Sequence, residues 1–187
     1  MIMKKDIRKR VFIAFISLLG CLLIVTCNKD RNVLPMPALA TAHINMYLTD
    51  SAANYQQVNV NIIGAQIHSD LAGWQPLVVH TGIYNLLAFN DTDTLLATGL
   101  VDSGHISQLR LILDSTGNTV MIDSTLYLLQ TPSAQQSGLK LQIDTVLAAD
   151  STYRLTIDFN AAKSVIKTGN NTYILKPVIS ADITPSP

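Results

Sequence analysis

The sequence of 187 residues contains no glutamate, and all 13 of its acidic residues are aspartates. Glutamate favours helices whereas aspartate favours turns and caps, so this composition favours a chain of strands and turns. Cysteine occurs only as Cys21 and Cys27. The chain after Cys27 therefore forms no internal disulfide, and it offers no thiol nucleophile and no thiolate metal ligand.

Charged residues are also few, at 14% of the chain, and aromatic residues make up 6%. Five of the 13 basic residues precede position 11, so residues 27–187 hold eight basic residues against twelve aspartates. A net charge of about −4 lacks the basic footprint that nucleic acids and anionic lipid surfaces require. We therefore expect no nucleic-acid partner.

The first thirty residues run from a basic cluster through an apolar segment to a cysteine and then to polar residues. The apolar segment, residues 11–26, would be roughly 24 Å long as a helix, which is short of the bilayer core of about 30 Å. This order predicts a bacterial lipoprotein signal peptide over residues 1–26 and a lipid on Cys27, followed by a flexible linker over residues 27–40. An uncleaved membrane helix is the alternative.

Cys21 competes with Cys27 as the lipidated residue. Gly20 precedes Cys21 and is a better small residue than Thr26, which precedes Cys27. Cleavage before Cys21 would, however, leave the apolar residues 22–25 on the mature chain, whereas the polarity changes directly after Cys27. We therefore assign the lipid to Cys27. Acylation by palmitate-like chains at several positions of such a cysteine gives a durable tether, because one chain alone holds only marginally.

The four residues that begin at Cys27, Cys-Asn-Lys-Asp, resemble the sorting signal of surface lipoproteins of Bacteroidota. Arg31 stands where such signals often carry a second acid. The resemblance implies attachment to the outer membrane, with the domain exposed at the cell surface.

Apolar and polar residues alternate with period 2 along residues 41–184, which is typical of half-buried strands. The pattern predicts strands at 41–49, 57–67 with a bend at Gly64, 74–80, 106–113, 119–122, 126–129, 139–144, 153–159 and 173–180. Pro177 places the last of these at a sheet edge or a bulge. We expect a helical turn or a loop at 90–100. No strand–helix–strand order appears, so the sequence predicts an all-β, two-layer antiparallel β-sandwich, immunoglobulin-like or transthyretin-like.

Several phrases of the chain occur together in one order: Leu48-Thr49-Asp50; Gly104 with the run Gln108–Leu113; Gln136–Leu141; Asp158–Val165; and Tyr173–Ile179. In combination they resemble the family called domain of unknown function 4382, over residues 41–182. Asp150-Ser151 departs from the family pattern, which often has a glycine in that turn. The resemblance implies an exported β-sandwich and no known activity.

Metal-ligating patterns are weak in this sequence. Its four histidines lie on different expected elements, so we expect surface or turn residues and no metal site; they are His43, His68, His80 and His105. The segment 90–94, Asn-Asp-Thr-Asp-Thr, alternates oxygen ligands as calcium loops do but lacks the glycine and distal glutamate of an EF-hand. We expect a solvated polar turn there, with calcium as the alternative. We predict no cofactor.

A glycosidase would need two facing carboxylates, and here both would have to be aspartates. The candidates are Asp50, Asp102, Asp114, Asp144 and Asp158. Most fall at strand ends or outward positions, where turn capping explains them. Asp158 and Lys163 are expected in an ion pair or a turn cap. No Gly-x-Ser-x-Gly motif and no phosphate-binding glycine loop occurs. We expect no enzymatic activity.

Trp74 is the only tryptophan, and it starts an expected strand after Gly73. We expect it in the core or at a sheet edge; an exposed sugar-stacking platform is the alternative. Together these observations predict a lipid-anchored envelope protein whose sandwich binds another envelope protein or an extracellular glycan. Two other hypotheses stay open: a glycan hydrolase that uses aspartates, and a pilus-anchor-like subunit that adds a strand at an open edge near 173–180.

Overall fold

The structure is a computed structural model that describes residues 40–131 and 137–186, so the expected leader, Cys21, Cys27 and most of the linker lie outside the described residues. Its elements are β1 (Thr41–Asp50), β2 (Gln57–Ser69), β3 (Gly73–Pro76), β4 (Val78–Val79), β5 (Gly82–Asn85), η1 (Leu86–Phe89), β6 (Thr94–Asp102), β7 (Gly104–Leu113), β8 (Thr119–Ile122), β9 (Thr125–Gln130), β10 (Leu139–Leu147), β11 (Thr152–Phe159), α2 (Ala161–Ser164), β12 (Val165–Lys167), η3 (Gly169–Asn171), β13 (Tyr173–Leu175) and β14 (Ile179–Pro185). Within the described residues, no helix is long and apolar enough to cross a bilayer.

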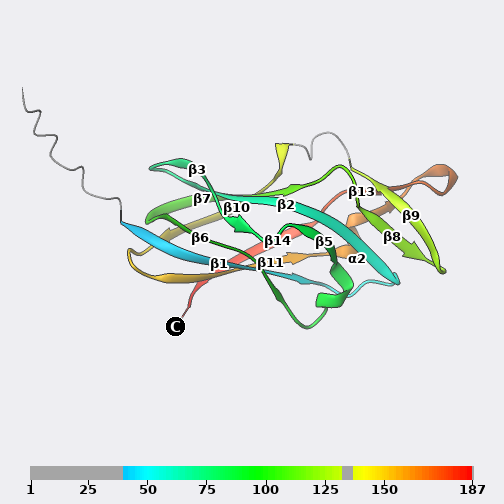
Figure 1. Ribbon diagram of the computed structural model, residues 1–187, viewed down its shortest axis with the longest axis horizontal. Coiled ribbons are helices and arrows are strands. Elements are labelled where there is room, and N and C mark those ends of the chain that lie inside the picture. Colours follow the sequence, from blue (N-terminus) through cyan, green and yellow to red (C-terminus); the bar gives the residue numbers. More distant parts are fainter. Residues whose placement is uncertain (1–39, 132–136, 187) are drawn as a thin grey trace, which may run out of the picture. The chain divides into compact units, whose positions relative to one another are not determined.

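The strands form two sheets that pack as a sandwich (Figure 1), which confirms the predicted fold class. The five-stranded sheet has the order β14-β11-β1-β6-β4. The nine-stranded sheet follows β10-β7-β2-β8-β9-β13-β12, and β3 and β5 pair with β2. The β1–β11 and β9–β13 ladders are parallel, so both sheets are mixed where we expected antiparallel pairing throughout. Alternation reveals which face of a strand is buried but not the direction of its neighbour.

The core lies between the sheets and follows the predicted alternation. Every second residue of β1 is buried, including Ile44, Met46 and Leu48. The same alternation buries Tyr153, Leu155, Ile157 and Phe159 in β11, and it buries Leu109, Leu111 and Leu113 in β7. Ile106 of β7 is also buried, three residues before Leu109, where the β2–β7 register shifts. A fully buried side chain of this size contributes about 1.5–3 kcal/mol. Packing of the two inner faces therefore stabilises the domain.

β6 corrects the expectation of a turn or loop at 90–100. Thr94–Asp102 pairs antiparallel with β1, with a register shift between Met46 and Tyr47. Around this bulge, Leu96 and the following Ala97 are both buried, so the strand does not alternate strictly. A bulge inserts an extra residue and interrupts the period of 2 by which strands are identified.

Two segments that we predicted as single strands each split between the sheets. In residues 74–80, β3 pairs with β2 while β4 pairs with β6, and the change of sheet occurs at the buried Leu77. In residues 173–180, β13 pairs with β9 and β14 pairs with β11. Pro76 precedes the first change and Pro177 lies in the second, and neither can donate a backbone hydrogen bond to a ladder. Both prolines therefore mark the points where the chain leaves one sheet for the other.

One edge of each sheet lies beside an edge of the other, because β10 contacts β14. The inward side chains of both strands pack against the core; they are Leu139, Leu141, Ile143, Ile179, Ala181 and Ile183. The outward side of β10 belongs to the surface described next.

Candidate functional site

The outer surface of the nine-stranded sheet carries a cluster of long polar side chains on β3, β2, β7 and β10. Their positions follow from register: Gln66 lies opposite Arg110 and Arg110 opposite Lys140, while His68 lies opposite both Trp74 and Gln108. We call this surface the polar face; its residues are Gln66, His68, Trp74, Gln108, Arg110, Lys140 and Gln142. The members on β2 and β7 adjoin buried residues, and those on β10 adjoin partly buried residues that pack against the core, so the apolar pattern of these strands turns the polar side chains outward.

The Trp74 indole ring anchors the polar face. The Arg110 guanidinium carbon lies 3.9 Å from the ring centroid, and the His68 ring meets the indole at 73° with centroids 5.1 Å apart. The Nη1 of Arg110 donates to Oε1 of Gln66 at 3.0 Å. Trp74 is half-buried on β3, whose described partner is β2 alone, in agreement with packing at a sheet edge. Such stacking fixes the plane of a guanidinium that would otherwise be mobile.

Lys140 brings a second positive charge to the same place. It lies directly opposite Arg110 in the β7–β10 ladder, and its Nζ is 5.8 Å from the indole centroid. Neither cation forms an ion pair with an acid of the described residues. Like charges directly opposite each other destabilise a sheet. The polar face therefore carries two cations that form no ion pair within residues 40–131 and 137–186.

Gly138 explains how the Arg110 side chain fits. A Cβ at this position would lie 2.5 Å from Cγ and 2.7 Å from Cδ of Arg110, and the backbone φ is +84°. Only glycine tolerates both the left-handed backbone and the close approach without strain. The turn before β10 thus makes room for the arginine stem that the indole covers.

A shallow pocket adjoins the polar face at Gln66. Its volume is about 230 Å³, and it is lined by Ile63, Gly64, Ala65, Gln66, Pro76, Leu77, Val79, Thr81 and Ile112. Most of the lining side chains are apolar, and none is acidic or basic. This pocket suits the apolar part of a ligand and has no group for acid–base chemistry.

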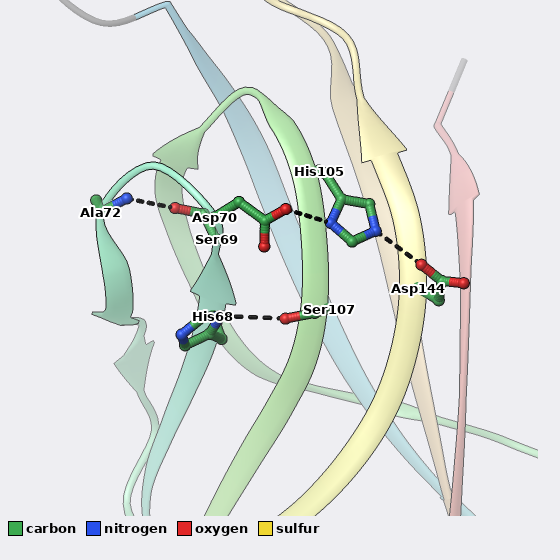
Figure 2. A network of polar contacts seen from close by, with 7 residues as sticks. All are labelled: His68, Ser69, Asp70, Ala72, His105, Ser107 and Asp144. Atoms are coloured by element: carbon green, nitrogen blue, oxygen red, sulfur yellow. Dashed lines mark hydrogen bonds and ion pairs between the residues drawn. The ribbon is translucent and has the colours of Figure 1, made fainter.

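His105 lies between two carboxylates near one end of the polar face (Figure 2). Its Nδ1 is 2.8 Å from Oδ2 of Asp70, and its Nε2 is 2.7 Å from Oδ1 of Asp144. The hydrogen bond with Asp144, followed by that with Asp70, raises the pKa of His105 above its ordinary value of 6.5. Because both ring nitrogens are engaged, this imidazole ring links β7, β10 and the turn after β2, and it has no free nitrogen to act as a base.

Asp50 is the most perturbed carboxylate among the described residues. It is 5% exposed at the end of β1; its Oδ1 accepts from the Ala161 N–H at 2.9 Å, and its Oδ2 has no partner. Its pKa is raised from 3.8 to about 6, chiefly by burial and in smaller part by the nearby charge of Asp158. Asp158 itself accepts from the Ser51 hydroxyl, at 3.0 and 3.1 Å to its two oxygens. The arrangement holds the start of α2 against β1.

The other three candidate aspartates lie apart from this pair, so the structure brings together only two of the five. Asp102 is buried at the end of β6, and its N–H donates to Gln75. Asp114 accepts from the N–H and the hydroxyl of Thr116, and these bonds lower its pKa. Asp144 belongs to the His105 cluster. Turn capping and strand-end positions therefore account for most of these residues, as expected.

An ion pair or a turn cap is the expected role of both Asp158 and Lys163, and of the two only Lys163 takes part in a cap among the described contacts. Lys163 contributes its backbone N–H, which donates to Oδ1 of Asn160 at the start of α2. No ion pair joins the two side chains among the described contacts.

The oxygen-rich segment 90–94 forms a polar turn beside the end of β1. The Thr49 hydroxyl lies 2.8 Å from the Thr92 carbonyl and 3.1 Å from the Phe89 carbonyl. The Asp93 carboxylate pairs with Arg154. The four histidines do not converge, and no three His, Cys or Asp side chains of the described chain are grouped so as to hold a metal ion.

The sequence analysis missed Arg110, Lys140 and Gly138. Alternation already turned Arg110 and Lys140 outward, but their position opposite each other depends on the register of β7 and β10, which alternation does not give. The phrases that resemble the family did contain these residues, in the runs 108–113 and 136–141.

Comparison with known proteins gives one match. The model of the family described as domain of unknown function (DUF4382) matches residues 41–177. No curated protein and no solved structure matches the chain significantly.

Proposed function

The chain belongs to the domain of unknown function 4382 family, and we propose that it is a lipid-anchored cell-envelope protein whose sandwich binds a ligand without catalysis. The anchor is a lipid on Cys27, at the outer membrane of a bacterium of the Bacteroidota type. The ligand, a glycan or another envelope protein, is held at the polar face.

The order of residues 1–40 supports the anchor. A basic cluster, a short apolar segment and a cysteine precede a linker with two prolines, and β1 begins directly after it at Thr41. The Cys-Asn-Lys-Asp sequence supports export to the outer face of the membrane. A linker of this composition keeps a domain at some distance from the bilayer.

One observation supports the binding role most directly: Trp74, Arg110 and Lys140 lie together on an outward surface, with positive charge left unpaired within the described residues. Conformationally fixed aromatic and arginine side chains on a surface are typical of binding sites. The adjoining apolar pocket adds a place for part of a ligand. The polar face lies outside the core, so packing of the core does not explain it.

The two other hypotheses have less support. Asp50 and Asp158 are close, but Asp50 is buried and neither residue lines the pocket, so a glycosidic bond has no described path to them. β14 is the edge of the five-stranded sheet, as strand addition requires, yet its free side lies beside β10. An incoming strand would have to displace that contact.

The anchor is tested by mass spectrometry of the full chain expressed in a Bacteroidota host. We expect the wild type and Cys21→Ser to carry acyl chains on residue 27, and Cys27→Ser to lose both the acyl mass and membrane association. Protease treatment of intact cells should degrade the wild-type domain if it is exposed. An acylated Cys27→Ser chain together with an unmodified Cys21→Ser chain would assign the lipid to Cys21 instead.

A further inference from the structure

We propose that the polar face binds an acidic glycan, with a sugar carboxylate received between Arg110 and Lys140. This inference rests on the proposed binding role of that face and names the ligand class. Three features support it: the unpaired charge, the fixed position of the guanidinium and the chemistry of the surrounding side chains.

The charge argument comes from the β7–β10 ladder. Arg110 and Lys140 are cross-strand partners, and such a pair of like charges costs stability unless an anion lies between them. The other stacked arginine of the domain shows the usual solution: Arg154 lies 3.7 Å from the Tyr47 ring centroid and is paired with Asp93. Arg110 has the same kind of stack but no acid among its described contacts. The missing acid is supplied, in our proposal, by the ligand.

The position of Arg110 is fixed before any ligand arrives. The indole covers its guanidinium, Gln66 binds one N–H of Nη1, and Gly138 leaves space for its stem. Its Nε is buried without a partner, and no described contact uses its Nη2. An arginine held in this way loses little side-chain entropy on binding a carboxylate, to which its planar fork is complementary. The structure therefore has a prepared anion site, not merely a basic surface.

The neighbouring groups favour a sugar as the carrier of the anion. Gln66, Gln108 and Gln142 present amides that donate to and accept from hydroxyl groups. Gln108 and Gln142 are cross-strand partners in the row next to Arg110 and Lys140. The mostly apolar side chains that line the pocket match the C–H faces of a sugar ring. A uronic acid combines a carboxylate, hydroxyls and such faces in one residue.

The test measures binding to the full-length acylated protein, purified in a neutral detergent, by isothermal titration with oligogalacturonate. The matched control ligand is the methyl-esterified oligosaccharide, which has the same sugar without its charge. We expect the free acid to bind and the ester to bind at least about tenfold more weakly, with affinity falling as salt increases.

Variants then assign the site. Arg110→Gln and Lys140→Asp should each weaken oligogalacturonate binding about tenfold or more. The first variant removes the guanidinium that binds the carboxylate, and the second reverses the charge at position 140. Arg154→Gln, which removes the arginine of the Tyr47 stack, should bind as the wild type does. Thermal unfolding and circular dichroism establish that each variant is folded.

The outcomes separate this inference from the proposed function. Equal binding of acid and ester, weakened by Gln108→Ala, would keep the polar face as a binding site and overturn the acidic class. Preference for phosphatidylglycerol vesicles over oligogalacturonate would also overturn it, in favour of a phosphate headgroup. If no oligosaccharide or vesicle binds and envelope extracts show no partner lost in Arg110→Gln, both the inference and the binding role fail.

Discussion

Each sheet of the sandwich stacks one arginine on an outward aromatic ring, but only one of these arginines has an acidic partner. In the five-stranded sheet Arg154 lies over Tyr47 and pairs with Asp93, so its charge is neutralised within the domain. In the nine-stranded sheet Arg110 lies over Trp74, with Lys140 opposite and no described acid in contact. An arginine–aromatic stack by itself therefore only contributes packing, and the missing counter-charge at Arg110 is what indicates a binding surface.

The two sheets also differ in the location of their unpaired charge. The five-stranded sheet has an incompletely satisfied carboxylate at Asp50, and it is buried. The nine-stranded sheet has unpaired cations at its surface. A buried charge without full hydrogen bonding destabilises the fold, whereas an exposed one costs little and stays available to a ligand. The buried Asp50 carboxylate should thus affect stability, and the surface cations should affect ligand binding.

Asp50→Asn should have the largest effect on stability. The pKa of Asp50 is about 6 in the folded chain, above the ordinary 3.8, so the folded state binds the proton more tightly than the unfolded state does. The stabilisation is fully present below pH 3.8 and is lost as the pH rises through about 6. The asparagine mimics the protonated form and keeps an oxygen for Ala161. We expect the variant to exceed the wild type in free energy of unfolding at pH 8 by up to about 3 kcal/mol, and to match it near pH 4.

Urea denaturation across this pH range measures the difference between the two proteins. Asp182→Asn is the control, because Asp182 is an exposed carboxylate on β14 of the same sheet. A variant less stable than the wild type at pH 8 would show that the Asp50 carboxylate is a net favourable cap of α2, against the comparison drawn above.

One glycine beside or within each sheet distinguishes the two sheets by its effect on stability. Gly138→Ala places a Cβ against the stem of Arg110 on a left-handed backbone, and we expect a loss of about 2 kcal/mol. Gly99→Ala in β6 brings a Cβ within 2.9 Å of Cδ2 of Leu77, the flexible end of a side chain, on an ordinary strand backbone. Its cost should be within about 0.5 kcal/mol of zero, because alanine also reduces the entropy of the unfolded chain. Equal losses in thermal unfolding would mean that the left-handed backbone and the close approach of Arg110 at position 138 cost no more than the Leu77 contact at position 99.

Much of this architecture was predictable from the sequence, because burial of one face imposes period 2. The inward residues of β1, β7 and β11 were identified in this way, and so was the tight hairpin of β8 and β9, where Asp123 and Ser124 both have positive φ. β6 was not predicted as a strand, because its bulge places Leu96 and Ala97 on the same side. The points at which the chain changes sheet, Leu77 and Pro177, were not predicted, because the alternation of a strand is the same in either sheet.

The candidate site was less accessible to prediction, since it depends on pairs that are far apart in sequence. Arg110 and Lys140 meet only through the register of β7 with β10, and Trp74 reaches Arg110 across β2. Asp50 looked like a residue of an ordinary turn, and only the docking of α2 shows that it is buried. Side-chain type suggested that an exposed tryptophan could stack on a sugar, but its partners came from the tertiary structure alone.

His105→Gln should have the smallest effect, and its pH dependence distinguishes it from Asp50→Asn. The bonds to Asp144 and Asp70 raise the pKa of His105 above 6.5, so the stabilisation is fully present below pH 6.5 and is lost as the pH rises through the folded value. The cluster is exposed, with 39% of the His105 side chain accessible, and solvent screens its charges. We therefore expect the wild type to be slightly more stable than the variant at pH 5.5, and this difference should vanish by pH 9.

NMR titration of the imidazole measures the cause directly: Asp144→Asn should lower the pKa of His105 more than Asp70→Asn does. If the His105 titration is unchanged in both variants, His105 does not link β7 to β10 through these hydrogen bonds.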